Sequence, residues 1–269
     1  MNRIDTKFHA LCAAGQKGFV AYIGAGDPNL RATAALAREF ERVGVDVLEL
    51  GVPFSDPLAD GVVNQLAAER GLRSGTTLRG VLKMVATLRR SGFKVPIVFY
   101  VYYNVVHHYG VKNFVRDAVA AGVDGVLALD LPPEEAELYE AAMRRGGLHP
   151  IYLVAPTTPS ARIGKISRHA SGFIYYVSRE GVTGMQKKLA SSATNHVKTI
   201  RKHSKLPVAI GFGISNPEQA RAAAQAADAV VVGSAIVNQI AKYGTHRQLA
   251  AKVGRFVGAM VRAVKKEGK

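Results

Sequence analysis

The sequence predicts an α/β protein, a single (β/α)8 barrel of the TIM-barrel type over residues 1–269. Eight short segments are almost continuously apolar and rich in β-branched residues, which is typical of parallel strands covered on both faces. Helical patterns separate these segments, and no Pro/Ser-rich linker or second composition divides the chain. About eight such βα units fit the length of one barrel. An open doubly wound sheet is the alternative, but the first strand lacks the GxGxxG turn typical of that fold.

The strands are expected where the apolar segments occur, at residues 19–26, 45–53, 95–104, 123–132, 150–156, 172–178, 207–213 and 227–236. An extra helix is expected at the N-terminus, with Cys12 packed beside Phe8 and Leu11. Long loops are expected after strands 2 and 6, at residues 54–75 and 179 to about 190. Both loops follow the carboxyl ends of strands, the face where barrel enzymes keep their sites.

The helices between the strands show amphipathic spacing and end signals. Segment 77–90 places five apolar residues on one face, namely Leu78, Val81, Leu82, Val85 and Leu88. Before the helix that ends at Gly44, Asp27 is a candidate N-cap. The phrases GVDVLEL, GVDGVLAL and AADAVVVG recur where a helix gives way to a strand. They indicate a weak internal repeat of the βα unit.

The chain is strongly basic, with 36 Lys and Arg against 20 Asp and Glu and a formal net charge of +16. Such a charge can indicate nucleic-acid binding, attraction of an anionic substrate, or a lineage of basic proteins. The two densest clusters have no interleaved aromatic residues, so we interpret them as solvated helix faces and expect no nucleic-acid partner. These clusters are Lys198, Arg201, Lys202 and Lys205, and Arg262, Lys265, Lys266 and Lys269.

Several features predict a cytoplasmic protein without a membrane partner. No segment approaches the roughly 20 consecutive apolar residues that span a bilayer. Near the N-terminus, Asp5, Lys7 and His9 interrupt the region that would be apolar in a signal peptide. The single cysteine, Cys12, excludes an internal disulfide bond.

Glu49 lies at the end of the second expected strand, between Leu48 and Leu50. A surface or ion-paired glutamate is the common explanation for such a residue. A carboxyl group in an apolar barrel mouth would instead have a raised pKa and could transfer protons near neutral pH. Asp60 follows on the more solvated loop, and two carboxyl groups in different environments suit an acid/base pair. Asp56 and Asp60 can equally be explained as turn formers.

Two glycine clusters, residues 211–215 and 232–236, follow the seventh and eighth strands. Glycine lets backbone N–H groups approach an anion, and a following helix offers its N-terminus, so the pair predicts a phosphate site. Either cluster alone also fits a plain turn. Segment 178–188 has glycines around Thr183 and suits either a flap or a passive loop. His107 and His108 lack partners at metal-ligand spacing, so no metal site is expected.

Seven motifs, in order over nearly the whole chain, resemble the family of tryptophan synthase alpha subunits. They are LELGVPFSDPLADG (48–61), YYN (102–104), DLPPEE (130–135), APTTP (155–159), YYVSREGVTG (175–184), GFGIS (211–215) and GSAIV (233–237). The resemblance implies a barrel lyase, without a cofactor of its own, that cleaves indole-3-glycerol phosphate to indole and glyceraldehyde 3-phosphate by a retro-aldol reaction. It also implies a PLP-bearing beta subunit as partner, in an alpha2beta2 heterotetramer.

The resemblance further implies roles for individual residues. Glu49 would carry the proton and Asp60 would hold the indole N–H, with Tyr175 orienting Glu49 and Thr183 positioning Asp60. The phosphate would be held by Gly184, Gly213, Gly233 and Ser234. The indole slot would be lined by Leu127, Leu153, Phe212 and Val231, with Tyr22, Asn64 and Tyr100 beside it. The beta subunit would contact Pro53, Asp56, Pro57, Asn104 and Pro132.

Several positions depart from the pattern of that family. Val62 and Asn64 follow ADG where a proline and an aliphatic residue are usual. Tyr22 replaces phenylalanine, Tyr100 an aliphatic residue, and Val105 the proline after YN. Three of these changes bring polar atoms near an apolar slot, where an unpaired buried polar group costs roughly 1–3 kcal/mol.

These changes motivate an alternative function, a weakly catalytic or non-catalytic barrel that mainly binds and activates the beta subunit. The retained Glu49, Asp60 and Thr183 favour the lyase, since a purely structural subunit has no need for an acid at a strand end. A different phosphate-binding barrel, such as an isomerase, would require catalytic residues on other strands, and the sequence offers no convincing set.

Overall fold

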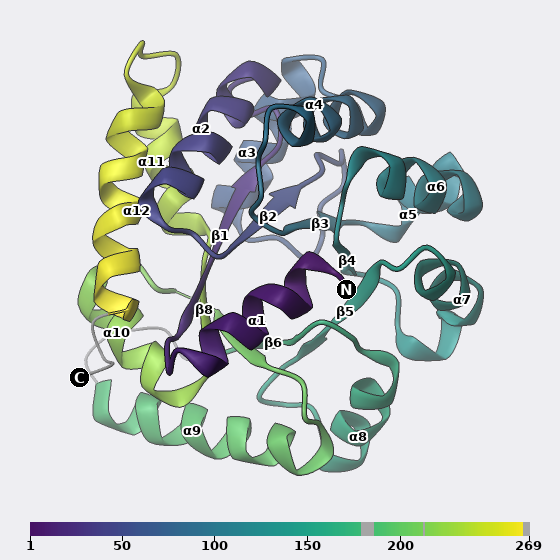
Figure 1. The fold of residues 1–269 in the computed structure, drawn as a ribbon, viewed down its shortest axis with the longest axis vertical. Coiled ribbons are helices and arrows are strands. Elements are labelled where there is room, and N and C mark those ends of the chain that lie inside the picture. Colours follow the sequence, from purple (N-terminus) through teal and green to yellow (C-terminus); the bar gives the residue numbers. More distant parts are fainter. Residues whose placement is uncertain (179–185, 212, 266–269) are drawn as a thin grey trace.

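Eight parallel strands close into a barrel in the order of the chain, as predicted. The barrel closes because β1 (Gly18–Gly24) pairs with both β2 (Val47–Gly51) and β8 (Ala229–Val232). The computed structural model describes residues 1–178, 186–211 and 213–265, and within α9 (Gln186–His203) it describes side chains only from residue 193. Figure 1 shows the helices arranged around the strands, with α1 (Arg3–Ala13) crossing one end of the barrel.

All eight strands lie within or next to their predicted segments. The remaining strands are β3 (Ile97–Val101), β4 (Gly125–Ala128), β5 (His149–Val154), β6 (Ile174–Val177) and β7 (Val208–Gly211). The other helices are α2 (Leu30–Val43), α3 (Val62–Arg73), α4 (Leu78–Arg90), α5 (Tyr103–Tyr109), α6 (Val111–Ala121), α7 (Glu137–Arg145), α8 (Ser160–His169), α10 (Pro217–Ala226), α11 (Ser234–Tyr243) and α12 (Leu249–Lys265), with a short 3-10 helix η1 (Pro133–Glu135).

Three local expectations were wrong. Most of the predicted loop at residues 54–75 is the helix α3, which leaves an irregular loop of residues 52–61. The N-cap of α2 is Asn29, whose side chain accepts the N–H of Ala32, because Asp27 is instead held by Arg70 through two hydrogen bonds. Cys12 is exposed rather than packed, since the buried face of α1 consists of Ile4, Phe8 and Leu11.

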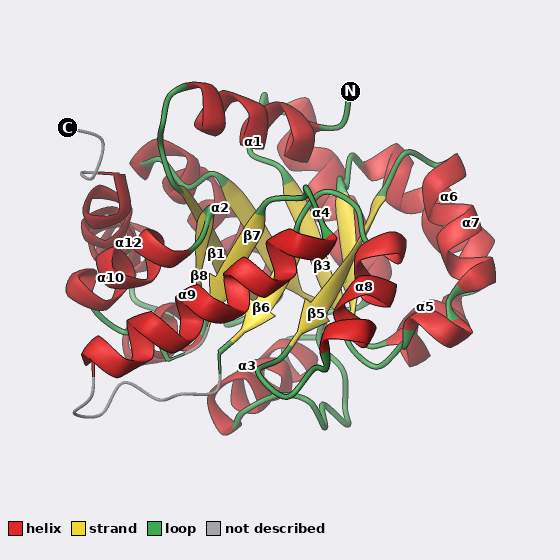
Figure 2. Ribbon diagram, turned by 90° about the horizontal axis from the view of Figure 1, so that it is seen from below, coloured by secondary structure: helices red, strands yellow, loops and turns green. Residues whose placement is uncertain are grey.

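Apolar side chains inside the barrel form a layer of their own. They come from seven of the strands and from Phe173, which directly precedes β6; the layer consists of Val20, Val47, Val98, Leu127, Ile151, Phe173, Ala209 and Ala229. The helix α1 closes the amino-terminal end of the barrel, where Phe8 packs on Phe173 with ring centroids 5.6 Å apart. Figure 2 shows α1 at one end of the strands and α3 at the other. The barrel interior is therefore filled at its amino-terminal end.

The aspartates of the three repeated phrases share one structural task. Each donates its backbone N–H to the carbonyl of a residue at the start of the preceding strand, and its side chain accepts the N–H of that same residue. The pairs are Asp46 with Phe19, Asp124 with Ile97, and Asp228 with Val208. Each aspartate also binds a cation, and two of these cations, Lys265 and Arg201, belong to the predicted basic clusters. The repeat thus fixes the starts of neighbouring strands.

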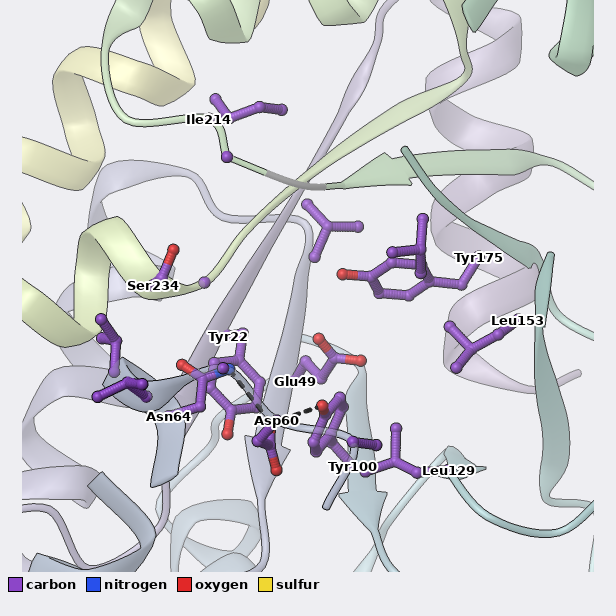
Figure 3. A pocket seen from close by; sticks show the side chains of 18 residues that line it. Tyr22, Glu49, Asp60, Asn64, Tyr100, Leu129, Leu153, Tyr175, Ile214 and Ser234 are labelled. Atoms are coloured by element: carbon purple, nitrogen blue, oxygen red, sulfur yellow. Dashed lines mark hydrogen bonds between the residues drawn. The ribbon is translucent and has the colours of Figure 1, made fainter. Parts of the chain in front are cut away.

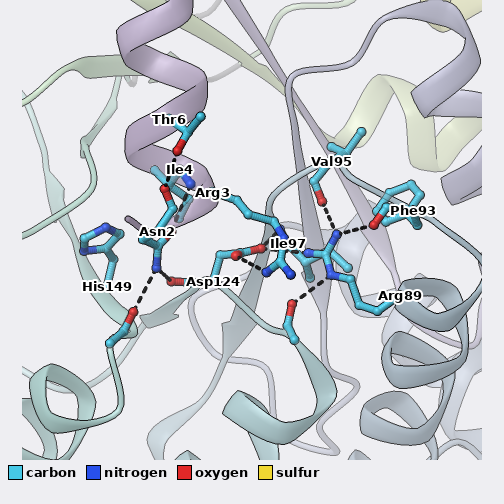
Figure 4. Close-up of polar contacts among 12 residues, drawn as sticks. Asn2, Arg3, Ile4, Thr6, Arg89, Phe93, Val95, Ile97, Asp124 and His149 are labelled. Carbon is cyan, nitrogen blue, oxygen red and sulfur yellow. Dashed lines mark hydrogen bonds and ion pairs between the residues drawn. The ribbon is translucent and has the colours of Figure 1, made fainter.

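Asp124 has the densest of these contacts (Figure 4). Its Oδ1 accepts from Arg3 at 2.8 Å, and its Oδ2 accepts from Arg89 at 2.7 Å and from the N–H of Ile97 at 2.8 Å. Burial lowers the pKa of the Arg89 guanidinium to about 10, although the charge of Asp124 opposes the shift. The amide of Asn2 donates to the Asp124 carbonyl and ties α1 to the same place. These contacts hold the amino-terminal end of the barrel together.

None of the helices within the described ranges combines the length and the apolar character needed to cross a membrane.

Candidate active site

A pocket of about 430 Å³ opens at the carboxyl ends of the strands (Figure 3). Side chains alternate along each strand, so the residues two positions beyond the interior layer face this pocket. Many of the predicted site residues line it: Tyr22, Glu49, Asp60, Asn64, Tyr100, Leu153, Tyr175, Gly213, Val231, Gly233 and Ser234. The structure thus brings both predicted carboxyl groups and the predicted phosphate glycines to one cavity.

Glu49 points into the pocket from β2 and is only 2% exposed. It lies in register between Tyr22 of β1 and Val98 of β3. Among the described residues, its Oε1 has no hydrogen-bond partner. Burial, reinforced by the negative charge of Asp60, raises the pKa of Glu49 to about 8. The common explanation of a paired surface glutamate is therefore excluded, and this side chain is a buried acid that is protonated at neutral pH.

Asp60 is held by hydrogen-bond donors on two sides. Its Oδ1 accepts from the hydroxyl of Tyr100 at 2.8 Å, and its Oδ2 accepts from the hydroxyl of Tyr102 at 2.9 Å. A longer hydrogen bond of 3.4 Å comes from the amide of Asn64. The hydroxyl of Tyr102 also accepts the N–H of Ala59, which fixes the loop just before Asp60.

Gly213, Gly233 and Ser234 lie across the pocket, at the ends of β7 and β8. Gly213 has a φ of 65°, a conformation that favours glycine. Gly233 precedes α11 and faces the ring of Tyr22, where an added Cβ would lie 3.3 Å from the ring. Ser234 begins α11, and the first N–H groups of a helix have no partners within it. An anion would meet backbone donors and the positive end of the helix dipole here.

The chain matches the family model described as "Tryptophan synthase alpha chain" over residues 8–265. The tryptophan synthase alpha chain of Opitutus terrae is 51% identical over 267 residues, which cover 99% of this chain and 100% of that protein. The corresponding chain of Geotalea uraniireducens is 48% identical and covers 100% of both proteins. The chain belongs to the tryptophan synthase alpha chain family.

Solved structures agree with this membership. The crystal structure of the tryptophan synthase alpha subunit from Legionella pneumophila superposes with a TM-score of 0.91 at 38% identity, covering 98% of each chain. A chain of tryptophan synthase from M. tuberculosis superposes with a TM-score of 0.87 at 31% identity, covering 98% of this chain and 99% of that one. The activity is accordingly that of a carbon–carbon lyase in tryptophan biosynthesis, and the alternative of a non-catalytic barrel is not favoured.

Leu127 does not occupy the position expected from the resemblance to tryptophan synthase alpha subunits. Leu127 belongs to the filled interior layer and does not line the pocket, because it lies on β4 two residues before the position that faces the pocket. Leu129, two residues further along, lines the pocket instead. Tyr175 lines the pocket, and its hydroxyl lies against Gly211, where an added Cβ would be 2.7 Å away. Its role in orienting Glu49 stays a prediction.

The departures from the tryptophan synthase alpha pattern differ in how they are accommodated. The hydroxyl of Tyr100 is satisfied by Asp60. The ring of Tyr22 meets that of Tyr100 edge-on, with centroids 5.0 Å apart, and its hydroxyl occupies the space that a Cβ on Gly51 would need. Of these departing residues, Asn64 has a buried oxygen, Oδ1, that lacks a hydrogen-bond partner within the described part of the chain.

Several residues that form the site were not predicted from the sequence. Ala59, Val63, Val177 and Ile214 line the pocket, and Tyr102 holds Asp60. The signal for Tyr102 was its place two residues after Tyr100, since both then point the same way from one extended segment. Three predicted site residues, Thr183, Gly184 and Phe212, lie outside the described residues. Within the described part of the chain, no group of three or more His, Cys, Asp or Glu side chains could hold a metal ion.

The residues expected at the beta-subunit interface lie on the segments that follow β2, β3 and β4, with Asn104 in the first turn of α5. Asp56, Asn104 and Pro132 are exposed and Pro57 is half-buried, so these four are accessible. Pro53 is buried instead, because α3 covers it and brings Gly71 close to its ring.

Proposed function

We propose that Glu49 is the proton carrier in the cleavage of indole-3-glycerol phosphate. The observation that supports this role best is a carboxyl group that is 2% exposed, has an unpartnered oxygen and has its pKa raised to about 8. General acid–base catalysis works best when the pKa lies near the working pH. A carboxyl group with the ordinary pKa of 4.5 would be almost fully ionised there and could not donate a proton.

The cleavage breaks the bond between C3 of the indole ring and the adjacent carbon of the glycerol side chain. The protonated Glu49 gives its proton to C3, and positive charge develops on the ring nitrogen. The resulting carboxylate takes the proton from the hydroxyl on the side-chain carbon. The electron pair of the carbon–carbon bond returns to the ring, the hydroxyl becomes the aldehyde of glyceraldehyde 3-phosphate, and indole leaves. Glu49 ends protonated, ready for the next turnover.

Asp60 accepts the ring N–H in this proposal. Its negative charge favours the ring cation that forms when C3 is protonated, which is charge stabilisation specific to the transition state. The hydroxyl donors of Tyr100 and Tyr102 fix the carboxylate before substrate enters, so little reorganisation is needed.

The phosphate of the substrate is proposed to bind at Gly213, Gly233 and Ser234. The start of α11 supports this placement, since it offers backbone donors across the pocket from the two carboxyl groups. Gly184 is retained as a fourth proposed phosphate residue, Phe212 as part of the indole slot, and Thr183 as the residue that contacts Asp60 on closure, all on the basis of the resemblance.

A beta subunit is the proposed partner, carrying PLP and forming an alpha2beta2 heterotetramer in the cytoplasm. Exposed apolar side chains on the pocket face support a partner there, since Leu58 is 84% exposed, Val62 69% and Leu66 47%. Asp56, Pro57, Asn104 and Pro132 are proposed to surround this patch. An indole-accepting active site docked on that face would receive the product at the pocket mouth. The single cysteine suits a reducing compartment.

The experiment that tests the role of Glu49 measures indole release from indole-3-glycerol phosphate, with and without a cognate beta subunit. Glu49→Gln should lower kcat by about 100-fold or more, because an amide cannot transfer the proton. Glu69→Gln, at an exposed glutamate of α3, is the matched control and should keep full turnover. Co-purification of the Glu49→Gln chain with the beta subunit reports intact folding, and undiminished turnover in that variant would remove Glu49 from the mechanism.

A further inference from the structure

The hydroxyl of Tyr100 occupies a special place in the pocket. Tyr100 lies on β3, at a position where the tryptophan synthase alpha family usually has an aliphatic residue. Its hydroxyl donates to Asp60 Oδ1 at 2.8 Å. Figure 3 shows this hydrogen bond beside Glu49. Asp60 itself lies on an irregular loop, so a donor on a barrel strand gives it a rigid reference point.

Neighbouring residues fix the position of the Tyr100 ring. The strand residue beside it in register is Gly51, which leaves room for large rings on this wall of the pocket. The ring of Tyr22 packs edge-on against that of Tyr100, with centroids 5.0 Å apart. Burial and the negative charge of Asp60 raise the pKa of the Tyr100 hydroxyl far above its ordinary value. The group is therefore a permanent donor that stays pointed at Asp60.

The donors around Asp60 leave a restricted direction for a ligand. A carboxylate has about four acceptor positions. Among the described residues, Tyr100 and Asn64 use Oδ1 and Tyr102 uses Oδ2, so a free position remains on Oδ2. The hydroxyl of Tyr102 also accepts the N–H of Ala59 and so holds the loop, whereas the hydroxyl of Tyr100 contacts Asp60 alone among the described residues. Removing the Tyr100 hydroxyl therefore perturbs Asp60 more selectively than removing that of Tyr102.

We propose that Tyr100 is a positioning residue of this chain, which turns the carboxylate of Asp60 so that its free oxygen position selects a ligand carrying a ring N–H. The proposal rests on the proposed role of Asp60 as the acceptor of that N–H. The hydroxyl of Tyr100 then supports Asp60 from the barrel wall before any ligand binds, at a position where the family usually has an apolar residue.

The test compares the affinities of the purified chain for indole and for benzofuran, an isostere whose ring oxygen replaces the N–H. Equilibrium binding is measured for the unmodified chain and for Tyr100→Phe, Tyr100→Leu and Asp60→Asn. Tyr109→Phe is the matched control, because its hydroxyl also donates to a carboxylate, Asp117, but lies outside the pocket. Thermal unfolding of each variant checks that the chain is folded. Tyr100→Leu introduces the aliphatic residue usual in the family. It provides a second variant without the hydroxyl in case Tyr100→Phe does not fold.

The ratio of the affinity for indole to the affinity for benzofuran tests the proposal. In Tyr100→Phe and Tyr100→Leu the preference for indole should fall about three- to ten-fold, the loss expected for one hydrogen bond. Benzofuran affinity and the ratio in Tyr109→Phe should stay unchanged. An equal loss of affinity for both ligands would indicate packing alone and would overturn the proposal, as would an unchanged ratio. An unchanged ratio in Asp60→Asn would instead overturn the proposed role of Asp60, independently of Tyr100.

Discussion

Glu49 and Asp60 face the same cavity, and the negative charge of Asp60 adds to burial in raising the pKa of Glu49 to about 8. The two carboxyl groups have opposite surroundings. Glu49 has an oxygen without a partner, while Asp60 accepts from two tyrosine hydroxyls. When the surroundings of two titratable groups differ in this way, one group suits proton transfer and the other suits charge stabilisation.

The raised pKa of Glu49 makes the stability of the chain depend on pH. The folded state holds the proton up to about pH 8, whereas the unfolded chain releases it near 4.5, so the folded state binds more protons in between. The free energy of unfolding therefore falls as pH rises from 4.5 to about 8, by up to about 5 kcal/mol. Glu49→Gln should remove this slope. Urea unfolding from pH 5 to 9 measures it, and parallel curves for both chains would contradict the burial argument.

Asp60→Asn should lower the pKa of Glu49. The substitution removes a negative charge that disfavours the ionised form of Glu49, and the larger effect of burial remains. The pKa of Glu49 should thus move down from about 8 but stay above 4.5. Carbon-13 NMR titration of the labelled glutamate carboxyl groups gives the value directly. A pKa that does not move would mean that the two groups are not coupled through the cavity.

Asp124→Ala should be strongly destabilising. It leaves Arg89, whose side chain is 10% exposed, without its charge partner, and a broken buried pair costs about 3–5 kcal/mol. It also leaves the N–H of Ile97 without its acceptor. Denaturant unfolding measures the change. The control Asp117→Ala removes a partly exposed aspartate that binds the exposed Arg116 and the hydroxyl of Tyr109, so it should cost much less stability. Similar losses in both variants would refute the role of the buried aspartate.

Leu58→Asp should weaken association with the beta subunit while lyase activity of the isolated chain is kept. Leu58 is 84% exposed at the tip of the loop before Asp60 and does not line the pocket. A charge in an apolar contact must be desolvated on binding, so the dissociation constant should rise at least ten-fold. Val119→Asp, at an exposed position on α6, is the control. Isothermal calorimetry with the beta subunit compares the two, and equal affinities would exclude Leu58 from the interface.

The barrel could be predicted because its signals are local. Apolar strands, amphipathic helices and turn residues recur along the chain, and all eight strands were found. The repeated aspartates were visible as a pattern, but their pairing with the preceding strand depends on the closed sheet. The N-cap at Asn29 was missed because Arg70, distant in sequence, binds Asp27.

The site was predictable where motif and alternation agree, as at Glu49 and Asp60. The depth of a residue inside the barrel was not predictable. Leu127, implied by the resemblance, and Leu129 both face inward, and only the stagger of the strands determines that Leu129 reaches the pocket. From the sequence, Tyr100 is expected to place an unpaired polar group near an apolar slot. Its hydrogen bond to Asp60 could not be predicted, because the bond joins a strand to a loop whose conformation the sequence does not reveal.

The most direct test of the central claim is the pH dependence of kcat/KM for cleavage of indole-3-glycerol phosphate. Cleavage begins with a proton from Glu49, so the rate should fall ten-fold per pH unit above an apparent pKa near 8. A rate that stays constant to pH 9.5, or that already falls above pH 5, would show that a protonated Glu49 does not start the reaction.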